Sequence, residues 1–431
     1  MSIFERLKAG LLLLLAVLGL AMAWASSAQS AGKDFYQFWV VGQSLNRPGI
    51  NIYADETRDR LGGEFLEKAE ASANPRLLVV AQYRRVLQTY STPFLYAVFR
   101  VFSTGNYDVD LRNYRLLMLG SLVFGIVVLC RLLNYPWEIA PAVIAVLAIW
   151  FDPLASDLFV GNVNCFQFAA IAGYLLAARR APSRHRFIVG GALLGMAVAF
   201  KPNLVFVPGL LAIHWIFSGR IRCLLLHAAG AGAGVAVAVC FSGMSFHNLR
   251  CWSEWMSALL AMPNDIIPVS MGNSSPVALI YESFGLRAAF PFTALLIGSS
   301  LVMVWHRRSG ATEDNGSVAA KEFSDLYAIS LGCLLVVIAT RLAWFHYYVL
   351  AIPAFLFLLQ PTASPTSGAR SVVSRSLPIL AFACLTPLSS MAPALLSNQQ
   401  AVLAAGAALL LFISFGFFPM VSNPAISGVK S

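Results

Sequence analysis

The chain has 431 residues, of which 58% are hydrophobic and 12% are charged, whereas soluble globular domains carry about 25% charged residues. This composition excludes a soluble globular protein and indicates a single membrane-embedded domain over residues 1–431. The formal net charge of +10 is explained by basic loops that face anionic membrane lipids, and nucleic acid is not expected as a partner.

The N-terminal segment begins the series of apolar runs. Arg6 and Lys8 precede an apolar run over residues 11–25, which is typical of a signal peptide or of an uncleaved first helix. The many later apolar runs favour the uncleaved helix. Each run near 20 residues is long enough to cross the bilayer. The sequence predicts about 12 transmembrane helices, near residues 7–26, 112–133, 138–153, 163–180, 187–201, 202–218, 222–243, 286–306, 324–342, 346–360, 377–393 and 400–420.

Basic residues are unevenly distributed between the alternate connections of these helices. If the chain starts inside, one set of connections is basic and therefore cytoplasmic. That set contains Arg131, Arg179, Arg180, Arg184, Arg186, Arg220, Arg222, Arg307, Arg308, Lys321, Arg370 and Arg375. The protein is therefore predicted to be a multi-pass protein of the plasma (inner) membrane.

Two long connections fall on the outer, periplasmic side, over residues 27–111 and 244–285. The first begins with a polar and aromatic stretch around Tyr36 and Trp39 that suits an interfacial helix. Residues 87–102 are apolar but contain Pro93. Counting them as a span would reverse the charge bias, so we expect a second interfacial or re-entrant helix there. Outer loops of this length commonly carry function.

Motifs for bound cofactors are missing from the sequence. The seven cysteines are scattered singly, and no histidine or cysteine spacing suits a metal. No Gly-rich phosphate loop and no serine nucleophile motif is present. No cofactor and no metal are therefore predicted, and a transferase built from this chain must take its donor from the membrane.

Asp34 is the acidic residue that the sequence singles out most sharply. It follows the first predicted span by about eight residues, where a lipid-borne substrate would present its headgroup. An unpaired carboxylate near the membrane is costly and indicates function. Two interpretations stay open, a catalytic group and an N-cap for a helix that begins at Phe35.

A second polar group lies at an outer turn between two predicted spans. Asp152 and Asp157 flank Pro153, and Asn162 and Asn164 follow them. Asp-Pro is common in ordinary turns, but two acids and two amides on one outer surface can also bind sugar hydroxyls. We therefore consider all four as candidate substrate-binding residues.

Lys201 and His346 are predicted at outer helix ends. Lys201 precedes the helix-breaking Pro202, and its ammonium either snorkels to the interface or holds a phosphate as a point charge. His346 stands in an aromatic segment before Tyr347, where a histidine is either a satisfied structural residue or a ligand of the substrate.

These motifs resemble those of glycosyltransferase family 87, the polyprenyl-phosphate-mannose-dependent α-mannosyltransferases of the GT-C class. The likeness covers residues 7–360, followed by C-terminal helices over 361–431, and it rests on the order of the motifs and on their shared outer placement. The residues that carry it are Asp34, Tyr36, Gly42, Tyr53, Tyr90, Ser91, Thr92, Pro93, Gly161, Asn162, Val163, Asn164, Phe200, Lys201, Pro202, His346, Tyr347 and Tyr348.

The resemblance implies an all-α GT-C type fold and an inverting, metal-independent sugar transfer on the outer face, from a polyprenyl-phosphate donor to a lipid or glycan acceptor. Asp34 would be the general base, and Lys201 and His346 would bind the donor phosphate. Candidate substrate-binding residues are Tyr36, Asp152, Asp157, Asn162, Asn164 and Tyr347. Two alternatives stay open: a glycan polymerase or ligase acting on lipid-linked sugars, and a lipid or sugar transporter.

Overall fold

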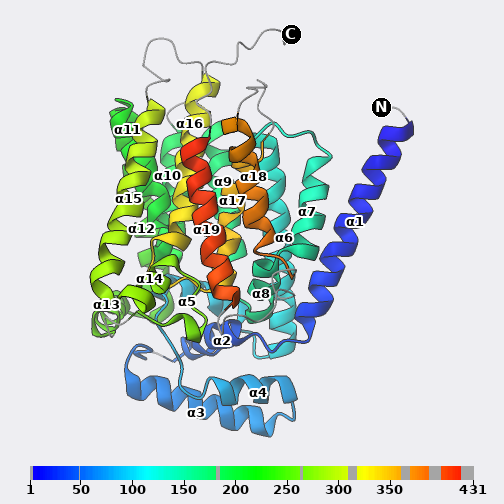
Figure 1. Cartoon of the computed structure of the whole chain (residues 1–431). Coiled ribbons are helices and arrows are strands. Elements are labelled where there is room, and N and C mark those ends of the chain that lie inside the picture. The colour runs from blue at the N-terminus through cyan, green and yellow to red at the C-terminus, as the bar shows by residue number, and fades with distance from the viewer. Residues whose placement is uncertain are drawn as a thin grey trace.

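The computed structural model describes residues 3–47, 49–180, 185–262, 266–308, 318–360, 369–387 and 399–418. The regular elements in these ranges are helices, which stand side by side in a bundle capped at one end by a helical layer (Figure 1). Arg184 and residues 388–393 of the expected span at 377–393 fall outside the described ranges.

Five helices in the described part of the chain are long and apolar enough to cross a membrane, or six if one bent pair is counted as a single span. The bent pair is α7 (Ile139–Trp150) with α8 (Asp152–Val160), whose axes differ by 69°. The chain is thus an integral membrane protein by composition, but the expected count of about 12 spans is not confirmed. The five are α1 (Ile3–Ala28), α6 (Tyr107–Leu132), α12 (Ile221–Phe246), α15 (Leu286–Arg308) and α19 (Gln399–Phe417).

Further helices stand between and beside these candidate spans. Prolines stand in the first turn of several of them, where a missing backbone N–H costs nothing. Pro202 thus begins a new helix directly after Lys201, and Pro353 begins another after η4. The elements are α9 (Asn164–Arg180), α10 (His185–Phe200), η2 (Pro202–Val205), α11 (Phe206–Phe217), α16 (Val318–Ile338), η4 (Phe345–Ala351), α17 (Ile352–Leu358) and α18 (Ala369–Ala383).

The packing of α10 against α12 fixes the end of α10 that carries Lys201. Gly191 and Gly195 face the backbone of α12, and a Cβ atom at either position would overlap that backbone. Small residues therefore let the two helices approach closely, as is common between membrane helices. This contact leaves little freedom to the residues that follow α10.

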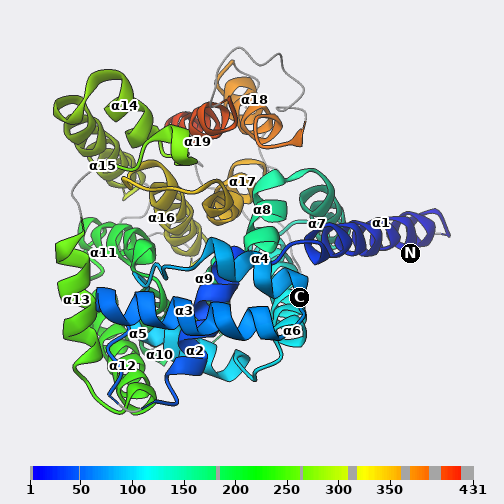
Figure 2. The same cartoon turned by 90° about the horizontal axis from the view of Figure 1, so that it is seen from below.

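The first outer connection folds into a layer across the end of the bundle, with α3 and α4 outermost (Figures 1 and 2). Its segment 87–102 forms the short α5 and η1, which are too short to cross about 30 Å of hydrocarbon. The layer consists of α2 (Lys33–Ser44), α3 (Asp55–Ala71), α4 (Pro75–Tyr83), α5 (Pro93–Phe99) and η1 (Arg100–Phe102).

The expectation that the aromatic residues of α2 lie at the lipid interface is wrong. Tyr36 and Trp39 are buried, and their rings stack on each other. Each of the two rings also meets the ring of Tyr107 of α6 edge-on. The indole Nε1 of Trp39 donates a hydrogen bond of 2.8 Å to Oδ2 of Asp110. The aromatic residues therefore pack α2 into the protein, beneath α3 and α4 of the layer (Figure 1).

The second outer connection forms α13 (Cys251–Ala261), η3 (Val269–Met271) and α14 (Pro276–Phe284). An isolated antiparallel bridge joins Asn273 to Trp344, two residues before His346. The amide of Asn273 also donates hydrogen bonds of 2.8 Å to the carbonyls of Ile267 and Arg341. The loop is therefore tied to the segment that carries His346.

The opposite end of the bundle has its own charged cluster. Arg220, which precedes α12, forms two hydrogen bonds of 2.7 and 3.1 Å with the carboxylate of Asp325 on α16. Trp215 donates a further hydrogen bond of 2.9 Å to the same carboxylate. This end carries several of the basic residues that the sequence assigns to the cytoplasm, and α1 begins and α19 ends on this side of the bundle (Figure 1).

Candidate active site

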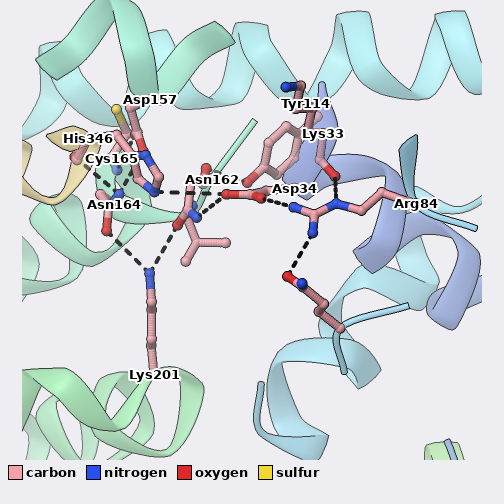
Figure 3. A network of polar contacts seen from close by, with 12 residues as sticks. Lys33, Asp34, Arg84, Tyr114, Asp157, Asn162, Asn164, Cys165, Lys201 and His346 are labelled. Carbon is pink, nitrogen blue, oxygen red and sulfur yellow. Dashed lines mark hydrogen bonds and ion pairs between the residues drawn. The ribbon is translucent and has the colours of Figure 1, made fainter. Parts of the chain in front are cut away.

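Asp34 lies in the first turn of α2, where the chain leaves α1. Its Oδ1 atom is 2.9 Å from Nη2 of Arg84, and its Oδ2 atom accepts a hydrogen bond of 2.6 Å from Nδ2 of Asn162 (Figure 3). The N-cap position of α2 is Gly32, with φ of 69°. The interpretation of Asp34 as an N-cap is therefore wrong, and its carboxylate faces other elements.

Asn162 reaches Asp34 because the chain turns sharply after α8. Gly161 ends that helix with φ of 71°, a left-handed conformation that glycine adopts without steric cost. A Cβ atom at Gly161 would lie 2.7 Å from Cβ of Phe35, so the turn packs closely against α2. The hydroxyl of Tyr114 donates a hydrogen bond of 2.7 Å to the backbone carbonyl of Asn162. The turn is thus fixed from both sides.

Lys201 approaches the same amide from the opposite direction, between α10 and η2. Its Nζ atom donates hydrogen bonds of 3.0 Å to Oδ1 of Asn162 and 3.4 Å to Oδ1 of Asn164 (Figure 3). The ammonium also lies 4.2 Å from the centre of the Tyr347 ring. The side chain therefore points into the protein and does not snorkel to the membrane surface.

The charge of Lys201 is set by two opposing effects. Burial lowers the pKa of Lys201 to about 8, while the carboxylates of Asp157 and Asp34 act in the other direction and raise it. A lysine of this kind is a cation at neutral pH with incomplete solvation, so it binds an anion more strongly than a fully hydrated ammonium does.

Asp157 supports this arrangement from beneath. The sequence suggests a turn around Asp152, but these residues form α8, which places Asp157 inside the protein, where it is buried. Its carboxylate accepts hydrogen bonds of 2.7 Å from Nδ2 of Asn164 and 3.3 Å from the backbone N–H of Cys165. Asn164 also donates a bond of 3.2 Å to the carbonyl of His346. Asp157 thereby fixes the amide that faces Lys201.

His346 stands on the far side of Asp34, in the first turn of η4. Its Nε2 atom lies 3.8 Å from Oδ2 of Asp34, and its side chain is 8% exposed. Among the described residues, this Nε2 atom is buried and has no hydrogen-bond partner. A buried polar atom without a partner is costly, and its position beside a carboxylate suits a group that binds substrate.

Two other candidates from the sequence lie apart from this network. Asp152 is at the start of α8, and its backbone N–H donates a hydrogen bond of 3.0 Å to the carbonyl of Leu385. Tyr36 is buried among Trp39 and Tyr107, and its hydroxyl has no partner among the described residues. No described contact joins either side chain to Asp34, Lys201 or His346.

Arg84 is a site residue that the sequence interpretation missed. It follows α4 in the outer layer and donates hydrogen bonds of 3.3 Å to the carbonyl of Lys33 and 2.8 Å to Oε1 of Gln88. Its side chain is 11% exposed beside Asp34. The available signal was the pair Arg84 and Arg85 in an outer connection, against the overall bias of basic residues toward the inside.

Comparison with known proteins gives a family and a distant relative. The model of glycosyltransferase family 87 matches residues 89–336, a range that contains Asp157, Asn162 and Lys201 but neither Asp34 nor His346. The chain is 25% identical over 229 residues to a polyprenol-phosphate-mannose-dependent α-(1-2)-phosphatidylinositol pentamannoside mannosyltransferase of Mycolicibacterium smegmatis. That match covers 52% of this chain and 49% of the relative, so the chain spans about half the length of the curated relative. No solved structure matches. The family match extends over more than half of the chain, which therefore belongs to glycosyltransferase family 87.

Proposed function

We propose that this chain transfers a hexose, with mannose as the sugar, from a polyprenyl-phosphate donor to a hydroxyl group of a lipid or glycan acceptor. The observation that carries the proposal is the pairing of Asp34 and Lys201 through one amide, that of Asn162. A carboxylate and an ammonium held a short distance apart supply the two charges that an inverting transfer from a phosphate requires. The family and the donor named for the relative support this choice.

Asp34 acts as the general base in the proposed reaction. As the acceptor oxygen bonds to the anomeric carbon of the donor, its proton passes to Oδ2 or Oδ1 of Asp34. The bond between that carbon and the phosphate oxygen breaks, and its electron pair leaves with the polyprenyl phosphate. Attack from the face opposite to the leaving phosphate inverts the configuration. General-base catalysis of this kind contributes about 10²–10⁴-fold to a rate.

Lys201 and His346 bind the donor phosphate. Negative charge grows on the leaving phosphate in the transition state, so a fixed cation there lowers the barrier. Lys201 supplies the charge, and the free Nε2 atom of His346 offers a hydrogen bond in place of the partner that it lacks. Both side chains are already in position, so little reorganisation accompanies the reaction.

The remaining polar groups orient the substrates. Asn164 and Tyr347 flank the ammonium of Lys201 and are placed to contact the sugar and its phosphate. Asp157 holds Asn164, and Arg84 holds Asp34. Tyr36 and Asp152 lie outside this network and are proposed to contact more distant parts of the acceptor. The relative is named for a phosphatidylinositol pentamannoside acceptor, which supports an acceptor with a lipid anchor for this chain.

We further propose that the site faces the outer side of the plasma membrane in a chain of about 12 crossings. The basic loops expected in the cytoplasm include Arg220 and Arg307, which lie at the ends of helices remote from Asp34. The short apolar helices would complete the count as crossings of their own. A site on the outer face can be reached by a polyprenyl-linked donor without a nucleotide sugar.

The test is sugar transfer by Asp34→Asn in proteoliposomes that contain polyprenyl-phosphate-mannose labelled in the sugar. The amide keeps the shape of the carboxylate and can accept one of its two hydrogen bonds, but it takes up no proton, so transfer should fall about 10²-fold or more. The matched control is Asp59→Asn, an exposed position on α3. Wild-type transfer by a folded Asp34→Asn protein would refute the role of Asp34, and absence of transfer by the wild type from any lipid-linked sugar would refute the activity.

A further inference from the structure

A cavity of about 230 Å³ lies at the outer end of α1, between this helix, α4 and the start of α6. Trp24 of α1 and Arg76 of α4 line it, together with Asp108, Arg112 and Arg115 of α6. None of these residues belongs to the network around Asp34 and Lys201. The cavity is therefore a separate feature of the outer surface.

The cavity is strongly cationic, because three guanidinium groups and only one carboxylate line it. That carboxylate, of Asp108, accepts a hydrogen bond of 2.7 Å from Nδ2 of Asn74. In the part of the chain that the structure describes, no side-chain hydrogen bond or ion pair engages the guanidinium of Arg76 or of Arg112. Within the described ranges, these two exposed arginines therefore stand beside the cavity with their guanidinium groups unpaired.

Arg115 supplies a third, fixed charge at the base of the cavity. Arg115 is buried, with 3% of its surface exposed. It donates hydrogen bonds of 3.2 Å from Nε to the carbonyl of Leu158 and 3.1 Å from Nη2 to the carbonyl of Ser30. Carbonyl groups orient this guanidinium but do not neutralise it. Burying a cation without a counter-charge is costly, and an anion in the cavity would offset that cost.

The surroundings of the cavity are those of a membrane boundary. It lies at the ends of two candidate spans, α1 and α6, and Trp24 is of the residue type that concentrates at headgroup depth. Below the arginines, α6 exposes Leu116 and Leu117, and α1 exposes Met22 and Leu18. Figure 1 shows that α1 diverges from the other helices as it leaves this end. The positive charge of the cavity matches the phosphate headgroup of a phospholipid, and the exposed apolar surface of α6 and α1 matches its acyl chains.

We propose that this cavity binds the phosphate of an anionic phospholipid of the outer leaflet. Arg76 and Arg112 donate hydrogen bonds to the phosphate oxygens, a pairing that suits the planar fork of arginine. Arg115 adds its charge from beneath, and the acyl chains lie along the exposed leucines of α6 and α1. Because Arg115 also holds Ser30, four residues before Asp34, the lipid would steady the connection between α1 and α2.

The experiment compares lipid binding to the full-length protein in detergent by native mass spectrometry. The probes are phosphatidylglycerol, phosphatidylcholine and inorganic phosphate. Phosphatidylglycerol should bind more tightly than phosphatidylcholine, because a choline cation opposes the arginines. The double variant Arg76→Gln/Arg112→Gln should lose about tenfold or more of the affinity for phosphatidylglycerol, since it removes two charged hydrogen-bond donors to the phosphate.

The matched control is Arg131→Gln, which removes an exposed arginine from the other end of α6 and should leave phosphatidylglycerol affinity unchanged. Equal binding of the two lipids, or an unchanged affinity in a double variant that retains the wild-type melting temperature, would overturn the proposal. Full displacement of phosphatidylglycerol by millimolar inorganic phosphate would assign the cavity to the free anion and would also overturn it.

Discussion

Arg84 and Asp34 form an ion pair with 2.9 Å between Nη2 and Oδ1, although 50 residues separate them in the sequence. Arg84 is itself held by the carbonyl of Lys33 and by Gln88. It therefore fixes one oxygen of the carboxylate and leaves Oδ2 toward Asn162 and His346. The outer layer thus orients the candidate base.

Replacement of Arg84 tests this orientation. Arg84→Gln should lower kcat about a hundredfold and leave the donor KM nearly unchanged, because a misdirected base affects the reaction more than donor binding. Arg84→Lys, which keeps the charge but loses the fork, should restore part of kcat. Arg85→Gln removes a neighbouring exposed arginine and serves as the control. A kcat of the wild-type size in Arg84→Gln would show that the pair only stabilises the fold.

The lowered pKa of Lys201 leads us to expect that donor binding depends on pH. Because burial lowers the pKa of Lys201 to about 8, the ammonium is present below this pH and is lost as the pH rises through it. Affinity for the donor phosphate should therefore fall between about pH 7 and pH 9. In Lys201→Arg the charge persists, so the donor KM should stay flat over this range. A wild-type KM that is equally flat would contradict the assignment of Lys201 to the phosphate.

Gly161→Ala should damage both stability and catalysis. The added Cβ would strain a residue with φ of 71° and would lie 2.7 Å from Cβ of Phe35. We expect a loss of about 1–3 kcal/mol in the free energy of unfolding and a lower kcat, because the turn carries Asn162. Gly120→Ala on α6, where nothing lies within 4 Å of the added atom, should be neutral in thermal unfolding and transfer assays. Equal behaviour of the two variants would refute this.

Arg220→Ala should lower the stability of the protein without changing its binding of the donor. The change leaves Asp325 with Trp215 but without its cationic partner, and the side chains of the pair are 14% and 20% exposed. Loss of a partly buried pair should cost about 2 kcal/mol of stability. Because the pair lies at the other end of the bundle, the donor KM of the folded variant should not change. A selective rise in KM without a lower melting temperature would contradict this separation.

The sequence predicted the membrane class and the family, because these depend on composition and on local motifs. It did not predict that α2 is buried, because a stretch with Tyr36 and Trp39 looks the same whether it meets lipid or protein. Burial is decided by what covers the helix. Here the covering elements are α3 to α5, and their packing over α2 is a tertiary contact that no local sequence pattern specifies.

The residues of the candidate site could be proposed from the sequence, but the contacts between them could not, because those contacts depend on how distant segments pack. Asp34, Lys201 and His346 each stand beside a recognisable signal: a span end, a proline and an aromatic segment. The contacts among them depend on the bend of 69° between α7 and α8, which turns a sequence typical of a loop into a helix that carries Asp157 inward. Arg84 depends on the path of α4 across the bundle end, and no local pattern encodes that path.

The position of Asn162 has a consequence for how the site keeps its charges. A carboxylate and an ammonium that meet directly neutralise each other, and the resulting contact pair is slow to exchange for a substrate. A neutral amide between them satisfies one hydrogen-bonding atom of each and acts as a spacer. Asn162 thus keeps Lys201 out of direct contact with Asp34, whose other oxygen is paired with Arg84. The ammonium of Lys201 is held by two amide oxygens and not by a carboxylate, so an incoming anion has only neutral partners to replace.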